Sequence, residues 1–359
     1  MQGFDNGRPT YGSVARMNMK KRITSFDIAA LAGVSQSTVS RALRGNPQVN
    51  EETRWRVWQA ARALNYTVDK NASNLRCKHS GTLALLFFED PTADESNINP
   101  FFLTMQSWIT RTCSERGYDL LVSFQQMSHN WHAEYASNHK ADGLLLLGYG
   151  DDAAYRDKLD MLAEAGTFFV RWGAALPGQA GICIGSDDHA GGRMVTEHLL
   201  EQGRKRIVFL GSTSRHSLEV FGRYQGHADA LYSAGLGVDP SLRLDAVTTE
   251  QSGYAAVCSL LDRGVDFDAV FGASDLIAIG AMRALLERGI SVPEAVAVVG
   301  FDDIPMTRNV SPSLTTVAQD TRRAGRALVE TLIDQIEGRP VRSTKLPTRL
   351  VVRGSSMSA

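Results

Sequence analysis

Residues 23–66 read ITSFDIAALAGVSQSTVSRALRGNPQVNEETRWRVWQAARALNY, a stretch that divides into three short helical patterns separated by turn residues. In the first pattern Ile28, Leu31 and Ala32 follow the i, i+3, i+4 spacing of one buried helix face. Ser25 stands where a hydroxyl can cap the start of that helix. The pattern therefore predicts the first helix of a small all-helical unit.

The second and third patterns complete this unit. Ser35 is expected to cap the second helix and Asn50 the third. The positions expected to face the core are Val39, Ala42, Leu43, Val57, Ala60, Ala61 and Leu64. The opposite side of the second helix carries polar side chains, from Gln36, Ser37, Ser40, Arg41 and Arg44. Amides, hydroxyls and guanidinium groups pair with base edges in a major groove and with phosphates, so this side predicts a DNA-reading face. A three-helix protein-interaction module is the alternative interpretation.

The charge of the chain is unevenly distributed, although its net value is only −1. Residues 20–78 hold eleven Lys and Arg against four Asp and Glu, a net charge of +7, which leaves −8 for the rest. Clustered cations favour binding to a polyanion because counterions are released from the phosphates. The distribution indicates that only the small basic unit meets nucleic acid, the alternative being a solvated charged surface.

Residues 23–66 resemble the opening of the LacI–GalR family of bacterial transcriptional regulators almost position by position. The resemblance implies that Gln36 and Ser37 begin the recognition helix as base-reading residues, with Arg41 as a further contact on the same face. It also implies a set of residues that position the helices on the DNA backbone, namely Thr24, Ser25, Phe26, Thr38, Ser40, Asn46 and Asn50.

The family resemblance continues into TVDKNASNLRCKH at residues 67–79, which it identifies as a hinge that folds when two subunits meet on DNA. By the resemblance Leu75 wedges into the minor groove and Ala72 lies against its floor, as apolar side chains of architectural proteins do. So short a helix is marginal on its own. The family usually has proline where Val68 stands, so a larger ordering cost on binding is expected. The alternative is that Leu75 is an ordinary linker residue.

From Gly81 onward, short apolar runs alternate with helical patterns, beginning with TLALLFF at residues 82–88 and a helix at 101–116. Strand–helix alternation of this kind builds parallel, doubly wound sheets. A second series of alternations is expected to begin with ICIGS at 182–186 and to include DAVTT at 245–249. Two series predict a two-lobed α/β domain behind the helix-turn-helix head.

These patterns give the expected domain organisation. The predicted segments are a disordered leader at 1–19, a helix-turn-helix domain at 20–66, the hinge at 67–79 and a ligand-binding and dimerisation domain at 80–359. Within the last, the expected N-lobe comprises about 80–173 and 319–345, and the expected C-lobe about 174–318 and 346–354.

Polar residues follow the apolar runs, where ligands bind in open α/β sheets because the strands end there. They are Asp151, Arg223, Ser274, Asp275, Asp302 and Asp303. Carboxylates and a guanidinium suit a polyhydroxylated ligand, since each can hold two hydroxyls. Trp172 and Phe301 can lie on the apolar face of a sugar ring. A small sugar or sugar derivative is therefore the predicted effector.

The second half of the chain, including GSDDHAGGRMVTEHLLEQGRKRIVFLG at residues 185–211, also resembles the LacI–GalR family. This half of the family is similar to periplasmic sugar-binding proteins. The resemblance implies effector contacts at Asp151, Arg223, Ser274, Asp302 and Gln319. Several sugar-responsive members have asparagine where Ser274 stands, which leaves the identity of the sugar open.

Other interpretations of these residues are structural or catalytic. Asp187 and Asp188 read as helix caps, and Asp303 as a turn residue. No GxSxG, P-loop or HExxH motif occurs, and the pattern of histidines and cysteines is not that of a metal site. We therefore expect no catalytic residues, no metal and no cofactor. A sugar hydrolase with paired carboxylates and a plain solute-binding protein remain as alternatives, the second disfavoured by the basic head and by the polar N-terminal residues.

The expected partners follow from the reading head. One helix-turn-helix gives little specificity, so a homodimer on a palindromic double-stranded DNA operator is predicted, with repression of sugar uptake or catabolism genes as the family's usual outcome. No apolar run is long enough to cross a membrane, and no secretory signal is seen, so a cytoplasmic, nucleoid-associated protein with reduced cysteines is expected.

Overall fold

The computed structural model describes residues 23–43, 45–66, 79–88, 98–125, 130–148, 152–175, 178–213 and 217–357. The expected leader, Ala72 and Leu75 of the expected hinge, and Asp151 lie outside these residues. The described residues form two compact units, 23–66 and 79–357, which are considered separately. We call them the head and the sensing unit.

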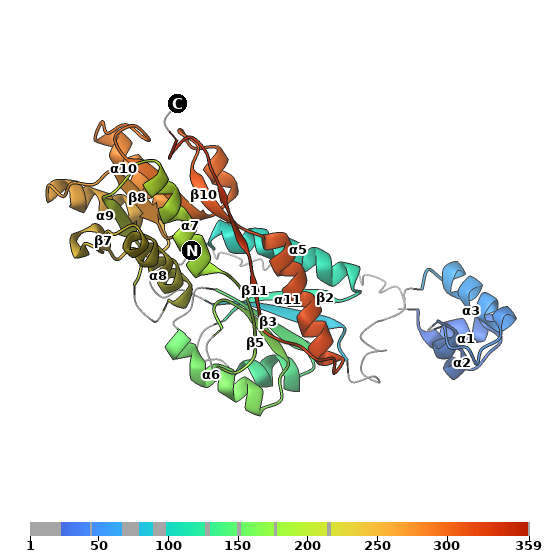
Figure 1. Cartoon of the computed structure of the whole chain (residues 1–359). Coiled ribbons are helices and arrows are strands. Elements are labelled where there is room, and N and C mark those ends of the chain that lie inside the picture. Colours follow the sequence, from blue (N-terminus) through green and yellow to red (C-terminus); the bar gives the residue numbers. More distant parts are fainter. Residues whose placement is uncertain are drawn as a thin grey trace, which may run out of the picture. The chain divides into compact units, whose positions relative to one another are not determined.

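The head consists of helices α1 (Ser25–Ala32), α2 (Gln36–Leu43) and α3 (Glu51–Ala63), as the sequence predicts (Figure 1). Its core is built almost entirely of small and β-branched side chains: Ile28, Ala29, Ala32, Val39, Ala42, Val49, Val57, Ala60 and Ala61. Small side chains let three short helices pack closely around one point. This core holds the outer side of α2 in place.

Two of the predicted helix caps are confirmed. The Ser35 hydroxyl accepts a hydrogen bond from the backbone N–H of Thr38 at 3.2 Å, and the Asn50 side chain accepts one from Thr53 at 2.8 Å. Each satisfies a donor that the first turn of a helix leaves unpaired.

The prediction for α1 needs two corrections. Thr24, not Ser25, precedes the helix, and its backbone N–H and hydroxyl donate to the Asp27 carboxylate at 2.8 and 2.7 Å. Thr24 caps the helix because Asp27, three residues later, accepts both of its hydrogen bonds. Leu31, expected in the core, is 57% exposed, because Ala29 takes the inward position beside Ile28.

The sensing unit contains two six-stranded sheets, which confirms the predicted two-lobed, mainly parallel α/β fold (Figure 1). The first sheet has the order β11-β5-β4-β3-β1-β2, with β1 (Thr82–Phe88), β2 (Asp119–Gln125), β3 (Gly143–Leu147), β4 (Phe169–Trp172), β5 (Ile182–Ser186) and β11 (Thr344–Leu346). The second has the order β12-β10-β9-β8-β6-β7, with β6 (Ile207–Leu210), β7 (Arg243–Leu244), β8 (Ala269–Gly272), β9 (Ala297–Asp302), β10 (Thr315–Gln319) and β12 (Thr348–Val351). Only β12 runs antiparallel to its neighbour, β10.

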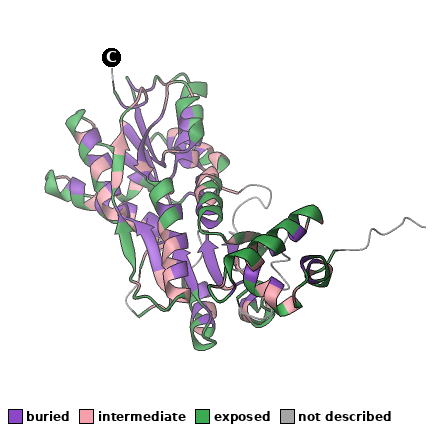
Figure 2. Ribbon diagram, turned by 90° about the vertical axis from the view of Figure 1, so that its right-hand side faces the viewer, coloured by how far each residue is buried: buried purple, intermediate pink, exposed green. Residues whose placement is uncertain are grey.

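The helices and short helical turns lie between and after the strands. They are α5 (Pro100–Glu115), the π-helix η1 (His132–Ser137), α6 (Asp152–Glu164), α7 (Asp188–Glu201), α8 (Leu218–Ser233), η2 (Pro240–Leu242), α9 (Glu250–Asp262), α10 (Asp275–Glu287), η3 (Pro305–Arg308) and α11 (Thr321–Ile336). Buried strands lie between helices whose outward faces are exposed (Figure 2). In the first sheet, for example, Leu85 packs in the same core as α5 and α11, whereas Leu86 packs with η1 and α6. Alternate strand residues thus face opposite helix layers.

Two predicted strands are placed differently by the structure. Residues 182–186, expected to open the C-lobe, form β5 and pair in parallel with β4 of the first sheet. Alternation along a sequence does not say which sheet a strand joins, and β4 reaches β5 through a loop without a helix. The expected strand at 245–249 is a loop, because the two-residue strand β7 comes just before it and Val247 donates its N–H to the Ser252 hydroxyl.

Helices α7 and α8 cross unusually closely because each has a glycine at the contact. A Cβ on Gly226 would meet the His189 carbonyl oxygen, and one on Gly192 would meet the Arg223 carbonyl oxygen. Neither backbone can yield without separating the helices. The crossing therefore fixes how the side chains of α8 stand against α7.

We expect Gly226→Ala to lower the free energy of unfolding by at least about 1–3 kcal/mol, because the added methyl has no space. Gly237→Ala is the matched control, since nothing lies within 4 Å of its added Cβ. Urea unfolding of both variants measures the difference. Equal stability of the two variants would contradict the tight crossing.

Candidate DNA-reading face and effector cavity

The outer side of α2 presents the predicted base-reading residues. Ser37 and Arg41 are exposed, on the side of α2 away from the buried Val39 and Ala42. Gln36 is half-buried and donates a hydrogen bond to the Ser25 hydroxyl at 3.2 Å. This contact joins the start of α2 to α1, so the residue at the start of the recognition helix is held in position.

The residues expected to position the head on DNA form short polar clusters. The Ser35 hydroxyl oxygen lies 2.9 Å from that of Ser37 and 2.8 Å from that of Thr38. Asn46 accepts a hydrogen bond from the backbone N–H of Gln48 at 2.9 Å. Phe26 is 72% exposed, which is unusual for a large apolar side chain and suits a surface that becomes covered on binding. These placements are compatible with the predicted roles of Thr38, Ser40, Asn46 and Asn50, which stay predictions.

In the sensing unit, Arg223 is the most deeply buried cation, at 1% exposure. It lies on α8 and not at a strand end, which corrects its expected position. Its Nε donates to Asp188 at 2.8 Å, and its Nη1 donates to the Ala273 carbonyl at 2.6 Å. The same Nη1 lies 3.7 Å from the Asp302 carboxylate. One guanidinium thus serves two buried carboxylates.

Asp302, the last residue of β9, is held in an unusual conformation. Its φ of 124° and that of Asp303, 56°, lie in a region that non-glycine residues rarely adopt. Such strain costs roughly 1–3 kcal/mol and persists only where the surroundings enforce it. Here Gln319 donates to Asp302 Oδ1 at 2.6 Å. The other carboxylate oxygen, Oδ2, is buried and has no hydrogen-bond partner among the described residues.

Asp302 and Gln319 line a cavity of about 370 Å³. Its lining comes from α5 and α11 of the first lobe and from β9, β10 and η3 of the second: Phe101, Thr104, Asp302, Asp303, Ile304, Pro305, Arg308, Asn309, Gln319 and Thr321. The cavity therefore lies at the carboxyl ends of β9 and β10 of the second sheet, as expected for an open α/β fold. Its volume is that of a small-molecule site.

Trp172 and Phe301, the two aromatic residues expected to contact the sugar ring, are both buried and do not line the cavity. Trp172 is buried at the end of β4, with its ring centroid 5.8 Å from that of Phe101, which does line the cavity. Phe301 is fully buried and lies under the Arg223 guanidinium, whose Cζ is 3.8 Å from the ring centroid. Phe301 therefore supports Arg223 through a cation–π contact and presents no face to a ligand, contrary to the prediction.

Ser274 also has a structural role. Its hydroxyl accepts the backbone N–H of Ile277 at 3.3 Å and so caps α10, and it does not line the cavity. The next residue, Asp275, is fully buried and accepts from the Thr316 hydroxyl at 2.5 Å and the Ile304 N–H at 2.8 Å. A Cβ at Gly300 would collide with this carboxylate. Asp275 thereby ties η3, which lines the cavity, to α10.

Of the three aspartates expected as caps or turn residues, only some have the expected role. Asp187 does cap α7, accepting the Ala190 N–H at 3.2 Å. Asp303 has the positive φ of a turn residue but also binds Arg353 at 2.6 Å. Asp188 is not a cap, because its carboxylate is buried against Arg223.

Burial controls the protonation of these carboxylates. Desolvation raises the pKa of Asp302 well above its ordinary value, although Arg223 opposes the shift. Desolvation likewise raises the pKa of Asp275 to about 7, against the hydrogen bonds from Thr316 and Ile304. Asp302, which lines the cavity, is therefore more easily protonated than an exposed aspartate, whereas Asp275 does not line the cavity itself.

Sequence reasoning missed Phe101 and Arg308 and assigned Asp188 only as a helix cap. The signal for Asp188 was present, since two consecutive aspartates before a helix exceed the one that a cap needs. Phe101 and Arg308 carry no such signal, because they reach the cavity only through the packing of the two lobes.

No group of three or more His, Cys, Asp or Glu side chains that could hold a metal ion occurs among the described residues. Within the same residues, no helix has the length and apolarity needed to span a bilayer.

The raised pKa of Asp275 predicts a pH dependence of stability. Between about pH 4, the pKa in an unfolded chain, and pH 7, the native state holds a proton that the unfolded state has lost. The contribution of Asp275 to the free energy of unfolding is therefore present at low pH and falls as pH rises through this window, by on the order of a few kcal/mol.

Asp275→Asn, which mimics the protonated carboxyl, should lack this decline. Unfolding free energies of wild type and variant are to be compared from pH 4.5 to 8, with exposed Asp245→Asn as the control. His227, whose pKa burial lowers to about 4, gives the opposite slope below pH 6.5 but is common to all three proteins. Parallel curves for wild type and Asp275→Asn would refute the assignment.

Comparison with known proteins agrees with this architecture. Residues 26–69 match the family described as bacterial regulatory proteins, lacI family, and residues 196–356 match the periplasmic binding protein-like domain. The chain is 36% identical to the HTH-type transcriptional regulator CelR of Thermobifida fusca, over 94% of this chain and 100% of CelR.

Solved structures give the same result. A CelR-cellobiose complex superposes with a TM-score of 0.69 at 35% identity, covering 93% of this chain and 100% of that chain. The lac repressor dimer bound to operator and the anti-inducer ONPF superposes with a TM-score of 0.80 at 25% identity, covering 94% and 100%. The chain therefore belongs to the LacI family of bacterial regulatory proteins and is a DNA-binding transcriptional regulator, as its sequence predicted.

Proposed function

We propose that this protein is a cytoplasmic homodimeric repressor whose affinity for a palindromic operator is changed by a neutral sugar bound in the cavity beside Asp302. The observation that carries the proposal is that Asp302 lines the cavity and that its buried Oδ2 has no partner among the described residues. A buried acceptor without a partner costs roughly 1–3 kcal/mol, which a ligand hydroxyl would recover. Arg223 and Gln319 hold the carboxylate toward this ligand.

The charges of the lining favour a neutral sugar over a sugar phosphate. Asp302 and Asp303 stand against one exposed cation, Arg308, which already lies 3.5 Å from Asp303. An added phosphate would meet carboxylates and no unshared guanidinium, whereas hydroxyls can donate to both carboxylates. Thr104, Asn309 and Thr321 supply further uncharged polar groups.

The similarity to CelR makes cellobiose the first sugar to test. CelR has been solved with cellobiose, and its identity to this chain extends over 93% of the length. Asp151 remains part of the proposed site on the strength of the family resemblance, and Trp172 as the ring contact expected from the sequence, since it packs against the cavity residue Phe101. No catalytic residue, metal or cofactor forms part of the proposed function.

An exposed apolar strand edge supports the proposed homodimer. Strand β2 is at the end of the first sheet, and Leu121, Val122 and Phe124 on it are 39%, 41% and 50% exposed. A long exposed edge of this kind pairs with or is covered by another chain. A second copy would also supply the second reading head that a palindromic operator needs.

On DNA, we propose that Gln36, Ser37 and Arg41 read base edges, that the polar residues around α1 and α2 fix the head on the phosphates, and that Leu75 and Ala72 enter the minor groove. Support comes from the exposed outer side of α2 and from the net charge of +7 over residues 20–78.

Arg41→Ala should cost about 1–3 kcal/mol of operator binding and relax the base preference at one symmetric position, because a bidentate contact to guanine is lost. Selection of binding sites from a random DNA pool measures the preference. Arg62→Ala, which removes one cation from α3, should weaken binding without changing the preferred sequence. An unchanged preference in Arg41→Ala would disprove base reading by this residue.

Asp302→Asn and Arg223→Gln should ignore the sugar and, once thermal unfolding verifies that each variant folds, should bind operator as the sugar-free wild type does. A ligand shifts a two-state protein only by its different affinity for the two states, so a protein that cannot bind it stays in its resting state. Calorimetry with cellobiose and an operator gel shift are to be run on each variant, with exposed Asp229→Asn on α8 as the control.

We expect cellobiose affinity to fall at least about tenfold in both variants and to be unchanged in the control. Wild-type affinity and response in both variants would place the effector site elsewhere. If cellobiose fails on the wild type, a thermal-shift screen of neutral sugars separates the two parts of the proposal, because any true effector should still lose its binding in Asp302→Asn.

A further inference from the structure

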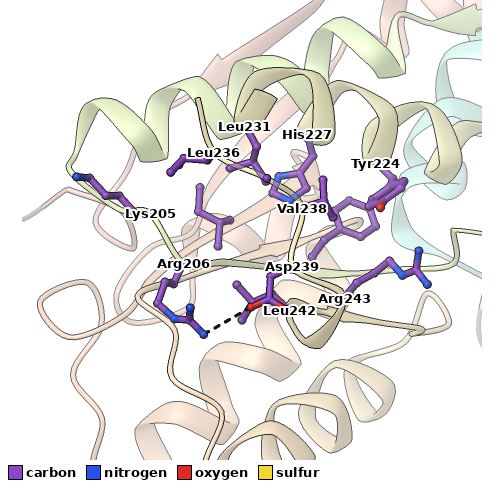
Figure 3. A pocket seen from close by; sticks show the side chains of 13 residues that line it. Lys205, Arg206, Tyr224, His227, Leu231, Leu236, Val238, Asp239, Leu242 and Arg243 are labelled. Atoms are coloured by element: carbon purple, nitrogen blue, oxygen red, sulfur yellow. Dashed lines mark ion pairs between the residues drawn. The ribbon is translucent and has the colours of Figure 1, made fainter. Parts of the chain in front are cut away.

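A second cavity, of about 260 Å³, lies on α8 and the edge of the second sheet, with none of the effector-cavity residues in its lining (Figure 3). It exists because β7 pairs with only two residues of β6, Phe209 and Leu210. The loop that leads to β7 covers the rest of this edge with Leu236, Val238 and Leu242. Apolar side chains thus line a space that could hold about nine waters at roughly 30 Å³ each.

One wall of this cavity is aromatic. The Phe209 ring centroid is 5.3 Å from that of Tyr224 and 5.7 Å from that of His227, and the last two residues both lie on α8. Leu231, from the same helix, continues the wall. Such a surface favours a flat apolar molecule.

His227 gives this wall a directed hydrogen-bond acceptor. Thr196 donates its one hydroxyl hydrogen to the Gly192 carbonyl at 3.0 Å, so it accepts from His227 Nδ1 at 2.9 Å. The proton of the neutral ring is therefore on Nδ1, and Nε2 carries a lone pair. Burial lowers the pKa of His227 to about 4, which keeps the ring neutral at pH 7. No described residue bonds to Nε2.

The rim of the cavity is cationic. Lys205, Arg206 and Arg243 line it against one carboxylate, Asp239. Arg206 is occupied, since it lies 3.8 Å from Asp239 and 3.3 Å from Asp266. Arg243 and Lys205 form no ion pair with a described residue, and Figure 3 shows the Arg243 side chain next to Tyr224. An anion at this end would meet an unshared guanidinium.

We propose that this cavity is a second small-molecule site, which takes a small carboxylate with a flat apolar body and a hydroxyl that donates to His227. The carboxylate binds Arg243, the body packs between the aromatic wall and Leu236, and the hydroxyl reaches Nε2. Tyr224 of the site follows directly after Arg223 in α8, so a ligand here contacts the helix that carries the buried effector network.

The test uses the full-length protein and 4-hydroxybenzoate, which joins a carboxylate, a ring and an opposed hydroxyl in about ten non-hydrogen atoms. Isothermal titration and saturation-transfer NMR should show one saturable site. Benzoate, which lacks the donor, and 4-hydroxybenzamide, which lacks the charge, should each bind about tenfold more weakly.

Three variants locate the binding. Arg243→Gln should weaken it about tenfold, Leu236→Trp should abolish it by filling the cavity, and Arg263→Gln, an exposed arginine outside the cavity, should leave it unchanged. Thermal unfolding verifies that each variant folds. If Leu236→Trp does not fold, the binding affinity of Arg243→Gln alone decides whether the ligand binds in this cavity. No saturable binding below about 10 mM, or equal binding by wild type and Arg243→Gln, would overturn the proposal.

Discussion

The buried guanidinium of Arg223, shared between the carboxylates of Asp188 and Asp302, is the constraint on which the sensing unit depends. A charge removed from water is tolerated only if it is paired and hydrogen-bonded, so each of its donors needs a fixed partner. Asp188 comes from α7, which explains why glycines bring α7 and α8 into contact. Asp302 comes from a strained strand end that Gln319 secures. The arrangement satisfies the cation and leaves one buried oxygen of Asp302, a residue that lines the cavity, without a partner among the described residues.

How far the sequence predicts this structure depends on whether the cause is local. The three helices of the head follow from apolar spacing and from caps within three residues, and the misassigned cap at Ser25 and the exposed Leu31 are errors of one position. The strands follow from short apolar runs, but the sheet that β5 joins is decided by pairing with β4. In the candidate site, Arg223, Asp302 and Gln319 are brought together as the family resemblance implied. Phe301, Ser274 and Asp188 have other roles. Phe301 and Asp188 both contact Arg223, which is far from them in the sequence, and no local pattern indicates these contacts. Ser274 caps α10.

The head and the sensing unit differ in charge and in the polar groups that they expose. The head concentrates positive charge and polar side chains on a small rigid core, which suits a surface that meets phosphates and base edges. The sensing unit is acidic overall and keeps the Arg223 cation buried, so the polar groups around Arg223 are turned inward, toward a small ligand. Ligand binding can change operator affinity only through the arrangement of the two lobes, because residues of both line the cavity. Helix α8, with Arg223 on one side and the second cavity on another, is the element through which either site would act.

We propose that the buried Oδ2 of Asp302 receives the effector. A crystal structure of the protein with its sugar bound should show a sugar hydroxyl within roughly 2.5–3.0 Å of Asp302 Oδ2, with the Arg223–Asp188 pair intact. A sugar bound elsewhere, or one that occupies the cavity while Oδ2 remains without a partner, would contradict it.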